Sequence, residues 1–77
     1  MNTTFLVKIL QAGTRILEVG VDSTFTVRRT LEAGGVTDFA NMTIRINNNN
    51  NATAANLDTI VREGDVIVLT SNVKGGG

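Results

Sequence analysis

The chain has 77 residues, contains neither cysteine nor histidine, and carries seven basic and seven acidic side chains that cancel. Its length allows one small domain, which buries about 60% of the surface that the unfolded chain exposes. The missing residue types remove disulfides, thiolate nucleophiles, imidazole bases and the usual zinc ligands, and the longest basic run is only Arg28-Arg29. This composition argues against stand-alone catalysis and against nucleic-acid binding.

The first 22 residues predict a β-hairpin. The segment 4–10 is rich in β-branched and aromatic residues, and its apolar residues share one face at period two. A turn around Gly13 leads into a second alternating segment that ends near Asp22. The residues expected to face the core are Phe5, Val7 and Ile9 in the first strand and Leu17, Val19 and Val21 in the second.

The hydrophobic period then changes from two to four, which predicts a short amphipathic helix. Val27 and Leu31 lie four residues apart, and polar residues occupy the other faces. The hydroxyl of Thr24 or of Thr26 is expected to cap the start of the helix, and Gly34-Gly35 to end it in the left-handed conformation. A helix this short persists only when it packs on a sheet.

The second half of the chain predicts two more strands. The segment 42–46 alternates strictly and reads as a third strand. A run of five asparagines, 47–51, is expected to form an exposed loop, and the segment up to residue 61 is expected to be irregular. A turn over 62–65 leads into a final apolar strand over 65–70. The element order predicts an α+β fold, in which one helix packs across a mixed sheet of four to five strands.

We expect a folded domain over residues 1–72 and a flexible glycine tail over residues 73–77. Gly75, Gly76 and Gly77 have no Cβ, so the tail is a thin strip of backbone that spans roughly 10 Å when extended. Such a tail can carry the terminal carboxylate into the active site of another protein. The alternative is a frayed terminus, or a cloning remnant, without chemistry.

Strand alternation also predicts an apolar patch on the sheet face opposite the helix. If Ile67 and Leu69 point to the core, the neighbouring aliphatic residues of the last strand point to the open face, and three aliphatic residues of the first hairpin share that parity. An uncovered face should be polar, so these residues suggest a contact surface. A homo-oligomer interface or a slipped register are the alternatives. The candidate partner-binding residues are Leu6, Leu10, Ile16, Val66, Val68 and, in the tail, Lys74.

Two charged side chains, Lys8 and Arg45, are candidates to flank this patch and orient a partner, although single surface charges are more often only solubilising. No apolar stretch approaches the ~20 residues that span a bilayer, and the N-terminus lacks the pattern of a secretory signal. We therefore expect a cytoplasmic protein without a membrane partner.

Over nearly its whole length the chain resembles the ubiquitin-like β-grasp proteins, and most of all the small sulfur carriers of thiamine and molybdopterin synthesis. The resemblance lies in the segments 23–27, 44–47 and 57–69, the last of which includes Glu63-Gly64-Asp65 before an apolar strand, and in the terminal glycines. It implies that an ATP-dependent adenylating enzyme activates the C-terminal carboxylate, which then forms a thiocarboxylate or is transferred to an amine.

By this resemblance Gly75, Gly76 and Gly77 are substrate atoms, and the chain itself binds no cofactor because the activating partner uses the ATP. A sulfur-acceptor enzyme or a target protein would be the second partner. The last turn and strand also resemble regulatory β-grasp modules of larger enzymes, which bind without covalent chemistry. The alternative function is therefore that of a noncovalent binding or structural module with an incidental tail.

Overall fold

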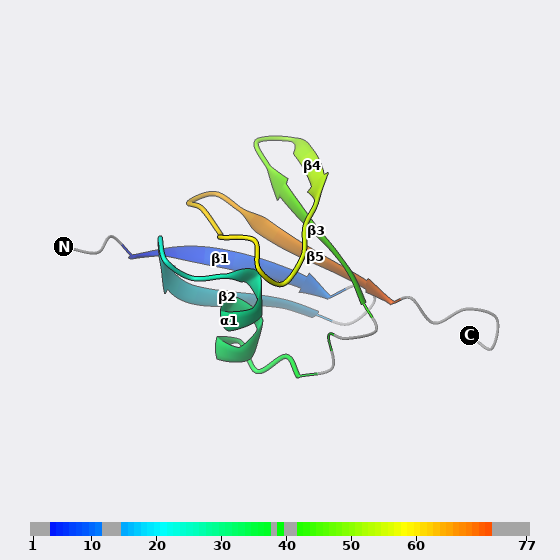
Figure 1. The fold of residues 1–77 in the computed structure, drawn as a ribbon, viewed down its shortest axis with the longest axis horizontal. Coiled ribbons are helices and arrows are strands. Elements are labelled where there is room, and N and C mark those ends of the chain that lie inside the picture. Colours follow the sequence, from blue (N-terminus) through cyan, green and yellow to red (C-terminus); the bar gives the residue numbers. More distant parts are fainter. Residues whose placement is uncertain (1–3, 12–14, 38, 40–41, 72–77) are drawn as a thin grey trace.

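A computed structural model describes residues 4–11, 15–37, 39 and 42–71 of the chain. These residues form an α+β fold with one mixed sheet and one short helix (Figure 1). The elements are β1 (Thr4–Gln11), β2 (Arg15–Asp22), α1 (Val27–Ala33), β3 (Met42–Asn48), β4 (Asn51–Ala54) and β5 (Val66–Ser71). The sheet has the strand order β2-β1-β5-β3-β4, in which β1 and β5 are parallel and the other neighbours are antiparallel.

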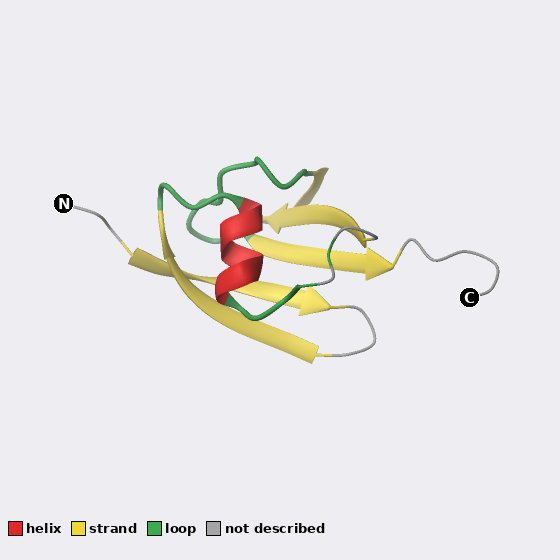
Figure 2. Ribbon diagram, turned by 60° about the horizontal axis from the view of Figure 1, so that its bottom comes forward, coloured by secondary structure: helices red, strands yellow, loops and turns green. Residues whose placement is uncertain are grey.

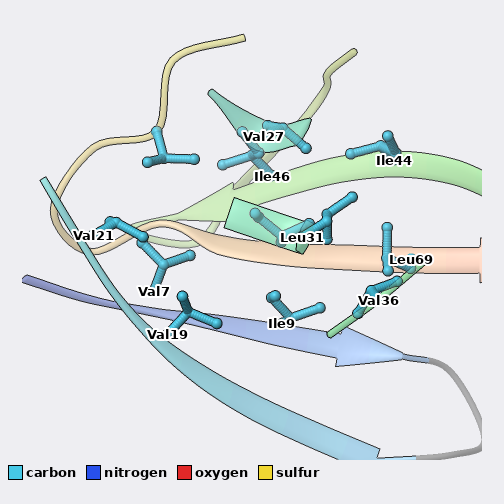
Figure 3. Close-up of a cluster of buried hydrophobic side chains, with 12 residues drawn as sticks. Val7, Ile9, Val19, Val21, Val27, Leu31, Val36, Ile44, Ile46 and Leu69 are labelled. Atoms are coloured by element: carbon cyan, nitrogen blue, oxygen red, sulfur yellow. The ribbon is translucent and has the colours of Figure 1, made fainter. Parts of the chain in front are cut away.

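The helix lies across one face of the sheet (Figure 2). The hydrophobic core fills the space between the helix and the sheet. Val27 and Leu31 of α1 are fully buried, as are Ile67 and Leu69 of β5, which are at most 1% exposed. The buried side chains of β1, β2 and β3 point to the same layer (Figure 3). The expected inward faces of the hairpin and of the last strand are thus confirmed.

The helix starts at the second of the two candidate caps. The Thr26 hydroxyl accepts a hydrogen bond from the Arg29 backbone N–H at 3.2 Å. Thr24 instead donates its N–H and its hydroxyl to the Asp22 carboxylate, at 2.8 and 2.5 Å. The hydroxyl bond is the main reason why the pKa of Asp22 is lowered. Thr24 therefore organises the turn after β2, while Thr26 begins the helix.

The two glycines after the helix have different roles. Gly34 keeps right-handed backbone angles, and Gly35 alone is left-handed, with φ of 85°. The Gly35 N–H donates to the Glu32 carbonyl at 3.0 Å, and the Val36 N–H donates to the Leu31 carbonyl at 2.9 Å. This pair of bonds is the Schellman arrangement, which satisfies the last carbonyls of the helix. Gly34 is needed for space, because a Cβ there would come within 2.9 Å of Val19.

The expectation that residues 47–51 form a loop is wrong. Asn47 and Asn48 complete β3, Asn49 and Asn50 form a two-residue turn, and Asn51 begins β4. The turn residues have φ of 53° and 68°. Two positive φ values in a two-residue hairpin are typical of a type I′ turn, and asparagine tolerates them better than other residues with a side chain. Shortening the run by two residues would therefore remove the turn rather than trim a loop.

Asn48 also links the hairpin to the turn before β5. Its side-chain amide donates to Asp65 Oδ1 at 2.6 Å and to the Glu63 carbonyl at 3.3 Å. The other oxygen of Asp65, whose side chain is buried, accepts from the Arg62 N–H at 2.8 Å. Gly64 supplies the left-handed residue of this turn, with φ of 89°. One asparagine of the run is thus a structural residue.

Candidate functional site

The candidate contact surface is the sheet face opposite α1. Val66 and Val68 alternate with the buried Ile67 and Leu69, so their side chains lie on this open face, where both are half-buried. Leu6 and Ile16 lie on the same face and are 62% and 66% exposed. The strand pairing therefore excludes a slipped register that would turn these side chains toward the core.

The register brings three of the five aliphatic residues side by side. Leu10 of β1 is opposite Ile16 of β2 on one side and Val68 of β5 on the other. Val66 lies two residues before Val68 in β5, on the same face of the sheet. Leu6 is separated from this row, and it is highly exposed because its partner on β2 is Gly20, which has no side chain. We call Leu6, Leu10, Ile16, Val66 and Val68 the open-face patch.

Both predicted flanking charges border the patch. Lys8 is paired with Glu18 on one side and with Val66 on the other. Arg45 is paired with Val68 and with Ala54. The two cationic side chains thus lie beside the two valines of β5, where they can contact acidic groups of a partner whose apolar groups cover the patch.

The residues expected to undergo chemistry fall outside the described part of the chain. Gly75, Gly76, Gly77 and Lys74, together with the tail 73–77 as a whole, follow the last described residue, Ser71. Their roles remain predictions from the sequence. The open-face patch is therefore the part of the predicted site that lies within the described residues.

A cavity on the other side of the molecule was not predicted. Its volume is about 650 Å³, and it lies between the β3–β4 hairpin and the segment 59–65. Ile60, which is 48% exposed, lines it together with the buried Ile46. The sequence signal that was overlooked is the pair Asn49-Asn50, because recognising a hairpin there would have placed β4, and with it one wall of the cavity.

Within the described residues, no group of three or more aspartate, glutamate, histidine or cysteine side chains is arranged to hold a metal ion. No helix among them has the length and apolarity to cross a membrane. Comparison of the chain with models of protein families, with curated proteins and with solved structures gave no match.

Proposed function

We propose that the chain is a ubiquitin-like β-grasp carrier or modifier, which acts through its C-terminal glycine carboxylate after activation by an adenylating enzyme. The strand order supports the β-grasp assignment, because a hairpin, a helix that covers one face and a last strand parallel to the first are what this fold requires. We place the protein in the cytoplasm, where an ATP-dependent enzyme can act on it.

The observation that carries the proposal is the open-face patch. The sheet face opposite α1 exposes aliphatic side chains from β1, β2 and β5, and two of these are more than 60% exposed. Leaving such residues in water is unfavourable by about 25 cal/mol per Å² of apolar surface, so a surface of this kind is typical of a protein that docks on another protein. An apolar docking face suits a chain whose chemistry is supplied by its partner.

The proposed chemistry requires little from the chain itself. The terminal carboxylate attacks the α-phosphate of ATP and releases pyrophosphate, which leaves an acyl-adenylate. A sulfide donor or an amine then attacks the acyl carbon and displaces AMP, which gives a thiocarboxylate or an amide. Glycine has no side chain to obstruct either attack. The bases and nucleophiles belong to the partner, in accord with the lack of histidine and cysteine in the chain.

The open-face patch also suits the second candidate, a noncovalent binding or structural module. The two candidates share the docking surface and differ only in whether the carboxylate reacts. A test of docking therefore addresses both, and a test of the tail, given at the end of the Discussion, separates them.

Replacing Ile16 by aspartate is expected to weaken binding to the cognate adenylating enzyme by about tenfold to a hundredfold, because the charge loses its water shell in the interface. The monomer should keep its melting temperature, since Ile16 is 66% exposed on an edge strand. Binding is measured by titration calorimetry with the purified enzyme.

Ile60→Asp is the matched control for this experiment. It introduces the same change at a residue that is 48% exposed and lies beside the cavity, away from the open face. The enzyme should bind this variant as it binds the unchanged protein. If both substitutions weaken binding equally, or if neither weakens it, the open-face patch is not the docking surface for the enzyme.

A further inference from the structure

The cavity beside the β3–β4 hairpin adjoins the free edge of the sheet. β4 is the last strand in the order β2-β1-β5-β3-β4, and among the described strands it pairs with β3 alone (Figure 1). Asn51 and Thr53 of β4 line the cavity, and Ala52 and Ala54 point to the opposite face of the sheet. An edge strand and a cavity therefore share one short segment of chain.

The backbone of β4 has hydrogen-bonding groups that face away from the sheet. The Ala55 N–H donates to the Ile44 carbonyl at 3.1 Å, which makes this pair a hydrogen-bonded one. In an antiparallel ladder such pairs alternate with pairs whose N–H and C=O groups point outward. By this alternation the pair of Ile46 with Thr53 is also hydrogen-bonded, whereas the pairs that contain Ala52 and Ala54 are not. The backbone N–H and C=O groups of Ala52 and Ala54 therefore point to the free edge of the sheet.

The side chains around this edge leave it accessible. Ala52 and Ala54 carry only methyl groups, and all four residues of β4 are exposed. Native edge strands are commonly protected by lysine, proline or a covering element. β4 contains neither lysine nor proline. An added strand would therefore meet outward donors and acceptors without steric obstruction.

The cavity is lined by both apolar and polar groups, as a site for an extended peptide requires. Its apolar part is formed by Ile60 and Ile46, of which only Ile60 is substantially exposed. Its polar part contains the side-chain amides of Asn49 and Asn51, which can donate and accept, and the Thr53 hydroxyl, which donates to the Ile46 carbonyl at 3.4 Å and can still accept. The charges of Arg62 and Glu63 at the rim cancel, and Asp65 is occupied by Asn48 and the Arg62 N–H. A strongly charged ligand gains little here, whereas a peptide backbone can use both donors and acceptors.

We propose that the free edge of β4 and the adjoining cavity bind an extended, uncharged peptide segment of another protein. The segment adds to the sheet as a strand through the outward groups of Ala52 and Ala54, and it places an aliphatic side chain against Ile60. The cavity lies on the face of the sheet opposite the open-face patch, and the site does not depend on the terminal carboxylate.

The test uses a displayed library of random linear peptides, selected against the folded protein. We expect the enriched peptides to combine alternating β-branched residues with a low net charge. Ala52→Pro and Ile60→Asp should each weaken their binding by about tenfold or more, because the first removes an outward N–H and the second removes the apolar contact. Proline is tolerated at this position of an edge strand because the N–H that it lacks faces away from β3.

Ala52→Ser, which keeps the N–H, and Ile16→Asp, which changes only the open-face patch, should bind the peptides normally. A second readout is hydrogen exchange of the backbone amides: bound peptide should slow exchange at Ala52 and Ala54. This readout needs no variant, so it remains decisive if Ala52→Pro unfolds the hairpin. Absence of enriched peptides, or enriched peptides that leave exchange at Ala52 and Ala54 unchanged, would overturn the proposal.

Discussion

Leu31→Asp is expected to unfold the domain at room temperature. Leu31 is 0% exposed and lies between α1 and the sheet, in contact with the main hydrophobic core (Figure 3). An aspartate there loses the apolar contacts of leucine and buries a carboxylate without a partner, which together cost about 6 kcal/mol or more. A domain of this size has total stability of only about 5 kcal/mol, so little of the folded state should remain.

The matched control is Leu6→Asp, because it makes the same chemical change at a residue that is 62% exposed. Its midpoint of urea unfolding should lie close to that of the unchanged protein, since the new charge stays in water. Circular dichroism of the two variants checks the expectation. Similar unfolding curves for both would mean that the helix does not cover the face of the sheet that we assign to it.

Asp65→Ala has the second-largest expected effect on stability. Asp65 is 6% exposed, and its carboxylate accepts hydrogen bonds from the Asn48 side chain and the Arg62 backbone N–H. Truncation removes two bonds to an ionised group, each of which contributes about 1.5–3 kcal/mol. Water can partly replace the lost acceptor because Asn48 is only half-buried and Arg62 is exposed, so we expect a net cost of about 2–4 kcal/mol. Chemical denaturation should show a clear loss of stability and weaker protection of amides in β4.

Asp58→Ala is the control for this substitution, since it removes the same charge from a side chain that is 91% exposed. The Asp58 carboxylate pairs with the Arg28 guanidinium at 4.0 Å on the surface. Such an exposed ion pair contributes little, so the control should change stability by less than about 1 kcal/mol. An Asp65→Ala variant as stable as the Asp58→Ala variant would show that the link between Asn48 and Asp65 is not structural.

The sequence predicted most of the fold because its hydrophobic period changes where the structure changes. Period two gave the hairpin and the third and last strands, and the four-residue spacing of Val27 and Leu31 gave the helix. The position of the helix cap was left open between Thr24 and Thr26, because both hydroxyls are at suitable spacing and only the tertiary structure directs Thr24 toward Asp22.

The fourth strand, β4, is not predicted from the sequence because it begins within the asparagine run. Low complexity is typical of loops, and β4 has no apolar alternation because all of its side chains are exposed. The strand exists because Asn49 and Asn50 adopt left-handed angles and because Asn48 is tied to the turn before β5. These interactions are long-range in sequence, so composition alone does not predict them.

The sequence predicts the face on which each candidate residue lies, but it does not predict which of these residues are neighbours across strands. Alternation alone placed Val66 and Val68 on one face, but the adjacency of Ile16, Leu10 and Val68 depends on the pairing of three strands. The cavity at Ile60 could not be predicted once the residues after β3 were taken for a loop. A surface formed by several strands can be predicted only when every one of those strands is predicted from the sequence.

The central claim, that the glycine carboxylate reacts, is tested most directly by intact-mass spectrometry. The full chain and a variant without Gly75, Gly76 and Gly77 are each incubated with ATP, the cognate adenylating enzyme and a sulfide donor. We expect the full chain to gain the mass of a thiocarboxylate and the shortened chain to stay unchanged, although both bind the enzyme through the open-face patch. An unmodified full chain that binds the enzyme as tightly as the shortened one would contradict the carrier function and favour a noncovalent module.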